Sequence, residues 1–143
     1  MLKAELKDGI YFDAGTGRGI GVEVRVTDKH GSSLLSSIID SDKITEHGNY
    51  LAPESSTNNY GELLGIQFAL ELALKENILY IFGDSKLIID YWSKGLANFS
   101  SLKKETVELI NKVSLQRKYF EALGGKIEHV SGDINPADLG FHK

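Results

Sequence analysis

The chain contains no cysteine, two prolines and a single tryptophan. The lack of cysteine excludes disulfide bonds, thiolate metal sites and a cysteine nucleophile. No apolar run approaches the roughly 20 residues of a membrane-spanning helix, and the first residues lack the apolar core of a signal peptide. Nothing therefore points to a membrane or to the outside of the cell, and a cytoplasmic location is the expectation.

A large excess of either charge is also absent, because the net charge is −4. This value argues against a strongly basic nucleic-acid-binding protein. The charges are unevenly distributed, since residues 86–126 hold eight lysines and arginines against four acidic residues. This positive segment is either a solvated helix face or a patch that contacts a nucleic-acid backbone, and charge alone does not decide between them.

The size and composition predict one globular domain. A chain of 143 residues is long enough for an ordinary hydrophobic core and too short for two full lobes. Its apolar content of 41% and charged content of 25% are typical of a soluble globular protein. We expect a polar lead-in over residues 1–8 and a single domain over residues 9–143.

The first half of the sequence predicts three strands and a long helix. Short apolar or alternating runs at 10–12, 20–26 and 32–39 predict an antiparallel meander, with a turn at 28–31. Residues 40–57 are polar and predict a loop. A helix then follows, with Asn58 or Asn59 as its cap and Glu76-Asn77 at its end.

The second half predicts alternating strands and helices. A continuous apolar run at 78–82 predicts a buried central strand. Ser85 is expected to cap a helix that ends at Gly95, and a third helix is expected over 101–123, before a last strand at 127–130. This order predicts an α/β fold with a five-stranded mixed sheet, an antiparallel meander followed by parallel strands, and helices packed on it.

Four carboxylates, Asp13, Glu62, Asp84 and Asp138, stand where strands or helices could bring them into one cleft. Charged residues seldom end buried strands unless a cation or a partner compensates them. Taken singly, each acid is more often a cap, a turn residue or a salt-bridge partner. Together they favour a site for Mg²⁺ or Mn²⁺, because hard cations prefer oxygen ligands. Two such ions about 4 Å apart can assist phosphodiester cleavage.

The neighbours of these acids form four recognisable segments. They are Tyr11-Phe12-Asp13-Ala14-Gly15, Thr57-Asn58-Asn59-Tyr60-Gly61-Glu62-Leu63-Leu64-Gly65, Gly83-Asp84-Ser85 and His129-Val130-Ser131-Gly132-Asp133-Ile134-Asn135-Pro136-Ala137-Asp138-Leu139. The Thr-Asn-Asn block entering a helix is the most specific of them. In this order and at these spacings, the chain resembles type 1 ribonuclease H over residues 9–140.

The resemblance implies a ribonuclease H-like fold and an endoribonuclease that hydrolyses the RNA strand of RNA/DNA hybrids, leaving 3′-hydroxyl and 5′-phosphate ends. It assigns Asp13, Glu62, Asp84 and Asp138 to catalysis and to the binding of two Mg²⁺ ions, with Mn²⁺ as an alternative. The implied partner is an RNA/DNA hybrid, without membrane contact. The chain would act as a monomer or as a domain of a larger protein.

The resemblance also implies substrate-binding residues. Asn58 and Asn59 match residues that contact the hybrid, including 2′-hydroxyls of the RNA strand, and an amide can donate to or accept from that group. Thr57 and Ser85 match residues near a pocket for a phosphate of the DNA strand. Lys86 stands where the family often has a glutamine in the minor groove. Structural roles stay open beside these, since Asn58, Asn59 and Ser85 are also good helix caps.

The sequence departs from the family in two further places. Asp133 occupies the position at which many members carry a histidine that is proposed to assist product release, so the resemblance does not extend to a histidine-dependent step. Residues 96–123 also lack a dense basic, tryptophan-rich protrusion. Tyr91 and Trp92 could stack on a sugar, although aromatic residues at helical spacing more often belong to the core.

Two rival hypotheses remain. The glycine-rich segment 13–19 also resembles the phosphate loop of actin-like and sugar-kinase ATPases. Those enzymes bind nucleotide between two lobes, whereas this chain has room for one, and a tight hairpin turn explains the glycines more simply. The other rival is a non-catalytic hybrid-binding module, and the presence of all four acids argues against it.

Overall fold

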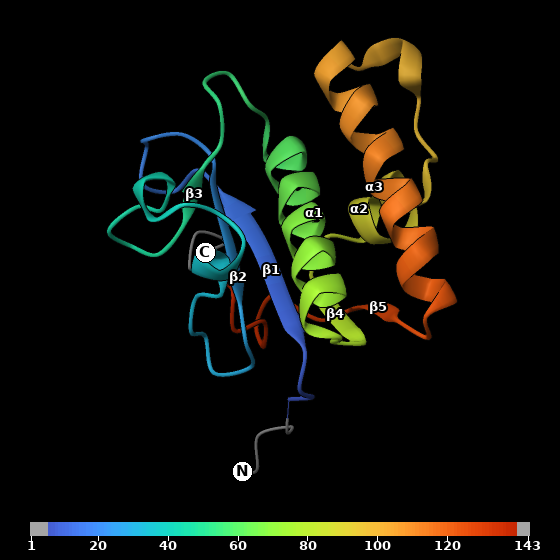
Figure 1. Cartoon of the computed structure of the whole chain (residues 1–143). Coiled ribbons are helices and arrows are strands. Elements are labelled where there is room, and N and C mark those ends of the chain that lie inside the picture. Colours follow the sequence, from blue (N-terminus) through green and yellow to red (C-terminus); the bar gives the residue numbers. More distant parts are fainter. Residues whose placement is uncertain (1–5, 140–143) are drawn as a thin grey trace.

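The computed structural model describes residues 6–139, which form a five-stranded mixed sheet with three α-helices packed on it (Figure 1). The strands are β1 (Ile10–Gly15), β2 (Glu23–Thr27), β3 (Tyr50–Leu51), β4 (Tyr80–Gly83) and β5 (Lys126–His129). The helices are α1 (Asn58–Glu76), α2 (Lys86–Asp90) and α3 (Lys104–Ala122). Among these residues, no helix combines the length and the apolar character needed to cross a membrane.

The strand order is β3-β2-β1-β4-β5, and the sheet changes direction at β1. Strands β1, β2 and β3 pair antiparallel, whereas β4 and β5 run parallel to β1. The predicted α/β class and mixed sheet are therefore confirmed. Because β1 and β4 are parallel neighbours, their carboxyl ends lie at the same edge of the sheet.

Two glycines let α1 lie close against the strands. A Cβ atom at Gly61 would be 2.3 Å from Val22 Cγ1, and one at Gly65 would be 3.0 Å from Phe12 Cδ2. A side chain at Gly61 would collide with Val22, and one at Gly65 would press tightly against Phe12. The first turns of α1 therefore lie directly over β1, which carries Glu62 toward Asp13.

The third strand is not where the sequence predicted it. Within the predicted strand 32–39, only Ser33 forms a β-bridge, with Thr27, and Leu35–Ser37 is a 3₁₀ helix. The reason lies in the spacing of the apolar residues at 34, 35, 38 and 39, which suits a helical turn better than the two-residue period of a strand. The edge strand is instead Tyr50–Leu51, inside the segment that was predicted to be a loop.

The helix ends differ from the prediction in detail. Thr57, rather than Asn58 or Asn59, caps α1, and its hydroxyl accepts a hydrogen bond from the backbone N–H of Tyr60 at 3.0 Å. Asn77 ends α1 in the left-handed conformation, as expected for a helix C-cap. Ser85 caps α2 as predicted, but the regular helix is shorter and continues as a 3₁₀ turn over Trp92–Lys94.

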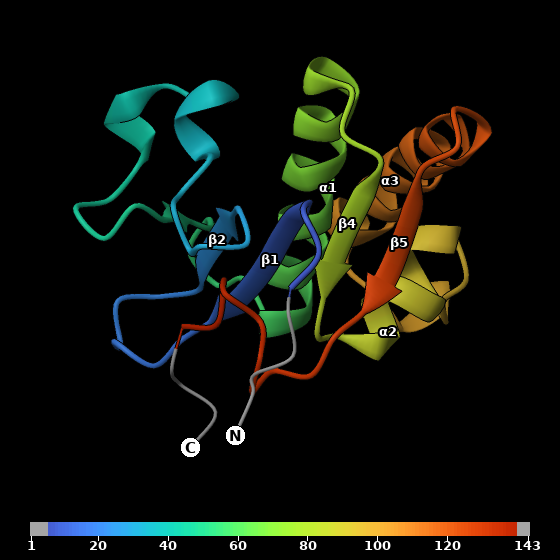
Figure 2. The ribbon, with the colours of Figure 1, turned by 90° about the horizontal axis from the view of Figure 1, so that it is seen from below.

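The two faces of the sheet are covered differently. The main core lies between the sheet and the helices, where Phe12, Leu63 and Ile110 are fully buried. On the other face, a small cluster of Tyr11 and Phe82 is closed by Ala137 of the C-terminal segment. This segment leaves β5 and passes back below the ends of β4 and β1 (Figure 2). It thereby brings the last predicted acid to the same edge as the first.

Candidate metal centre

Three aspartates meet at the carboxyl ends of the parallel strands. Asp13 lies within β1, Asp84 directly follows β4, and Asp138 comes from the C-terminal segment. One carboxylate oxygen from each lies within 4.8 Å of the other two. The structure thus brings together three of the four predicted acids, from segments that are far apart in the sequence.

Glu62, the fourth acid, approaches the same edge from the first turns of α1. Its side chain is buried, with 7% of the residue exposed. Burial raises the pKa of Glu62 to about 10, and the adjacent carboxylates of Asp13 and Asp84 contribute to the increase. A hydrogen bond from the backbone of Ala14 acts in the opposite direction. At neutral pH without a cation, this group therefore retains a proton.

The C-terminal segment is fastened to the sheet by side-chain and backbone hydrogen bonds. The Asn135 amide nitrogen donates to the carbonyl oxygen of Phe12 at 3.0 Å and to Asp84 Oδ2 at 3.2 Å. The backbone N–H of Leu139 donates to Asp13 Oδ2 at 3.2 Å. Asp138 is therefore placed by its neighbours in the turn, although it lies in no helix or strand.

Asn135 was not among the predicted site residues. The residue is 4% exposed, and its Oδ1 accepts from the backbone N–H of Ala137 at 3.0 Å, which forms an Asx turn. The signal in the sequence was an Asn-Pro pair just before an acid, a combination that favours a turn. Only the folded chain shows that the same amide also reaches Asp84.

The residues predicted to contact substrate lie around this edge. Thr57, Asn58 and Asn59 are exposed at the start of α1, Lys86 is exposed at the start of α2, and Ser85 is half-buried. Thr57 lines a cavity of about 190 Å³. Its other walls are the loop 53–56, Tyr60, and the start of α3 at Lys103, Glu105 and Thr106. Ser85 does not line this cavity.

Comparisons with protein-family models and with curated proteins give no match. The function must therefore be argued from the residues and their geometry.

The glycine-rich segment after β1 forms a turn between antiparallel strands. The backbone N–H of Gly19 donates to the carbonyl oxygen of Thr16, and Gly19 and Gly21 both have positive φ. The segment leads directly into β2, which pairs with β1. The segment is therefore a hairpin connection, as the simpler interpretation predicted, but its loop over residues 16–22 is longer than a tight turn.

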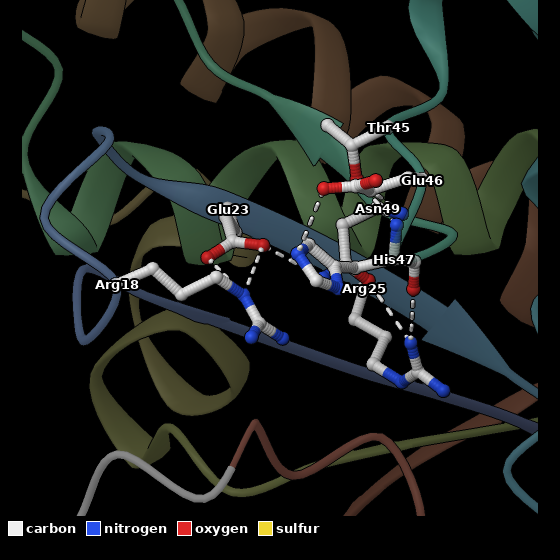
Figure 3. A network of polar contacts seen from close by, with 7 residues as sticks. All are labelled: Arg18, Glu23, Arg25, Thr45, Glu46, His47 and Asn49. Atoms are coloured by element: carbon white, nitrogen blue, oxygen red, sulfur yellow. Dashed lines mark hydrogen bonds and ion pairs between the residues drawn. The ribbon is translucent and has the colours of Figure 1, made fainter.

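Beside this turn lies a buried polar network that the sequence did not reveal (Figure 3). Glu23 is fully buried, and its carboxylate binds Arg18 Nε at 3.0 Å and Asn49 Nδ2 at 3.0 Å. Asn49 Oδ1 in turn accepts from Arg25 at 3.1 Å. The network connects the hairpin turn to the loop before β3, and it accounts for the burial of Glu23 as one end of an ion pair.

The positive segment 86–126 is not a uniform outer surface. Arg117 is 5% exposed, and its guanidinium donates to Ser93 Oγ at 2.6 Å and to the backbone of Ile89. It joins α3 to α2 rather than facing a partner. Trp92 packs against the main core, whereas Tyr91 is exposed.

The structure shows where His129 and Asp133 lie. His129 is the last residue of β5, as predicted for a strand end, and its Nε2 lies 3.2 Å from the backbone oxygen of Asp84. Asp133 is exposed in the turn before Asn135, and its backbone N–H donates to Ser131 Oγ. His142, near the end of the chain, lies outside the described residues.

Proposed function

We propose that this chain is a metal-dependent endoribonuclease that hydrolyses the RNA strand of RNA/DNA hybrids. The observation that carries the proposal is the meeting of the Asp13, Asp84 and Asp138 carboxylates within 4.8 Å, beside a buried Glu62. Carboxylates that converge at one edge of a sheet repel one another unless cations bind among them. The specific sequence blocks around these acids supply the substrate class.

The donor set fits a hard divalent cation. Its members are all carboxylates, and three of them lie close enough to bind one metal ion together. The carboxylates of Asp13 and Asp84, which help to raise the pKa of Glu62, would also attract a cation, and a bound cation would displace the proton of Glu62. We propose that the four acids bind two Mg²⁺ ions, with Mn²⁺ as an alternative.

The chain's own groups would bind and orient the reacting phosphodiester. Asp13, within β1, and Asp84, directly after the adjacent strand β4, would hold the centre of the site, and Glu62 and Asp138 would complete it. When bound, the ions would activate a water molecule and stabilise the leaving oxygen, so that the products carry 3′-hydroxyl and 5′-phosphate ends.

The start of α1 suits a nucleic-acid backbone. A helix N-terminus favours phosphate because its first N–H groups and its dipole both attract negative charge. Asn58 and Asn59 are exposed there and would bind 2′-hydroxyls of the RNA strand. The cavity lined by Thr57 and Lys103 would receive a phosphate of the DNA strand. Lys86 would lie along the groove.

The test is cleavage of an end-labelled RNA/DNA hybrid with Mg²⁺, with Mn²⁺ and with EDTA. We expect cuts in the RNA strand only, in either metal, and no cuts in EDTA, in duplex DNA or in duplex RNA. Mass spectrometry of the fragments identifies their ends. Hybrid binding without cleavage in either metal would favour the binding-module hypothesis, and ATP hydrolysis without hybrid cleavage would favour the phosphate-loop hypothesis.

Asp84→Asn tests the site itself. This variant keeps the shape of the side chain but removes a charge that a cation requires, and we expect turnover to be lost while the thermal unfolding stays cooperative. Asp42→Asn is the matched control, because Asp42 is exposed in a 3₁₀ turn outside the cluster. Full activity of Asp84→Asn would refute the assignment.

A further inference from the structure

Asn135 is a buried residue whose side chain contacts both the Asp84 carboxylate and β1. Its amide nitrogen donates to both Phe12 O and Asp84 Oδ2, and its amide oxygen accepts from the backbone N–H of Ala137. The residue is 4% exposed. A primary amide has two N–H donors and one carbonyl oxygen, so each of its polar atoms has a partner here.

These contacts determine the orientation of the amide. If the amide were flipped, its oxygen would face the Phe12 carbonyl and the Asp84 carboxylate, and its nitrogen would face the N–H of Ala137. All three contacts would then be repulsive. The amide is therefore held in one orientation, with one N–H directed at Asp84.

The neutral charge of the amide matters at this place. A lysine or arginine would also donate to Asp84, but its positive charge would compete with a bound cation. An aspartate would bring one more negative charge against Asp84 and could not donate when ionised. An amide orients the carboxylate and leaves its charge intact.

Asn135 also controls a second acid. The backbone N–H of Asp138 donates to the backbone oxygen of Asn135 at 2.9 Å, and the bond from Asn135 to Phe12 O ties this turn to β1. Asp84 and Asp138 both lie outside regular strands and helices. The contacts that hold these two acids thus meet at one residue, through the side chain of Asn135 for Asp84 and through its backbone oxygen for Asp138.

We propose that Asn135 is a positioning residue that presets the geometry of Asp84 and Asp138 for a divalent cation. This inference rests on the proposed function in that the cluster binds such a cation. Groups that orient metal ligands through hydrogen bonds typically change metal affinity or activity by about 10- to 100-fold when they are removed. Because Asn135 is buried, it acts through the two aspartates and not by touching a hybrid.

The experiment compares Mn²⁺ binding by isothermal titration calorimetry in the wild type, Asn135→Ala and Asn135→Ser. We expect the Kd for Mn²⁺ to rise about 10- to 100-fold in both variants. The serine variant leaves a polar gap in which water can satisfy Phe12 O, so it retains more stability than the alanine variant. With the hybrid at saturating Mg²⁺, kcat is expected to fall while KM stays within twofold of the wild type.

Asn49→Ala is the matched control. Asn49 is as buried as Asn135 and also makes side-chain bonds at both ends of its amide, but these serve Glu23 and Arg25 in the network of Figure 3. We expect it to lower the unfolding temperature without changing the Kd for Mn²⁺. A wild-type Kd in both Asn135 variants, or a change in KM alone, would overturn the inference.

The two proposals fail in different measurements. Failure of the proposed function appears in the wild type, as Mn²⁺ binding without cleavage of the RNA strand or as no Mn²⁺ binding at all. Failure of the positioning role appears as equal Mn²⁺ affinity in the wild type and in the Asn135 variants.

Discussion

Glu62→Gln removes the ionisable group at the buried start of α1 while nearly preserving its shape. In the wild type, the pKa of Glu62 is raised from 4.5 to about 10, first by burial and then by Asp13 and Asp84. Between these two pH values the folded chain holds a proton that the unfolded chain releases. The contribution of this group to stability is thus complete below pH 4.5 and is lost progressively as the pH rises toward 10.

The size of the effect follows from the shift. Each pH unit above 4.5 lowers the free energy of unfolding of the wild type by about 1.4 kcal/mol, which accumulates to about 3 kcal/mol at pH 7. The glutamine variant lacks this dependence. It should therefore match the wild type near pH 4.5 and exceed its stability by about 3 kcal/mol at pH 7, a large share of a typical domain's 5–15 kcal/mol.

Urea unfolding between pH 4.5 and 8, in EDTA, measures this difference. Trp92 is the only tryptophan of the chain and packs against the core, so its fluorescence reports on unfolding. Glu76→Gln, at an exposed position at the end of the same helix, is the control for the loss of a glutamate carboxylate outside the cluster. A difference between Glu62→Gln and the wild type that does not grow with pH would refute the reasoning.

Divalent cations should change this result. Because a bound cation displaces the proton, saturating Mg²⁺ should remove much of the pH dependence of the wild type but leave that of Glu62→Gln unchanged. If Mg²⁺ changed the pH dependence of stability equally in both proteins, Glu62 would not belong to the metal centre.

Three further predictions concern the elements around the site. Gly61→Ala places a Cβ 2.3 Å from Val22 Cγ1, so the free energy of unfolding of this variant, measured in urea, should fall by about 1–3 kcal/mol. An unchanged urea midpoint would mean that α1 can move away from the sheet without loss of stability. Thr57→Ala removes the cap of α1 and should lower the free energy of unfolding by about 1 kcal/mol in the same assay, whereas Thr57→Ser should retain the cap. An equal loss of stability in both variants would contradict the capping role. Lys103→Ala should weaken hybrid binding and reduce the slope of the logarithm of the binding constant against the logarithm of salt concentration by about 1, with kcat unchanged. An unchanged slope would show that Lys103 does not contact the hybrid.

Much of the framework could be predicted from the sequence because it depends on local chemistry. The turn at 28–31 closes with a bond from Gly31 N–H to Asp28 O, as its composition indicated. Ser85 and Asn77 mark helix ends through their own conformations and hydrogen bonds. The predicted third strand was wrong because residues 32–39 can turn as readily as they can extend. Neighbouring residues alone do not decide which segment pairs with β2.

The acids themselves are a property of the sequence, and their arrangement is a property of the fold. Asp13 and Asp84 were expected to come into one cleft, and the parallel pairing of β1 with β4 brings the ends of their strands to one edge of the sheet. The raised pKa of Glu62 required α1 to lie close over β1, which Gly61 and Gly65 allow. Burial is decided by distant parts of the chain and so cannot be read from a local pattern.

By itself, the sequence determined the acids at the strand and helix ends, the Ser85 cap of α2, the end of α1, the hairpin connection and the α/β order of the elements. Only the tertiary structure decided that Tyr50–Leu51 forms the edge strand, that Glu23 is a buried ion-pair partner and that Asn135 joins Asp84 to β1. The physical reason is sequence separation. Caps and turns satisfy backbone groups within a few residues, whereas Asn135 lies 123 residues from Phe12 and 51 from Asp84, and such contacts exist only once the whole sheet has formed.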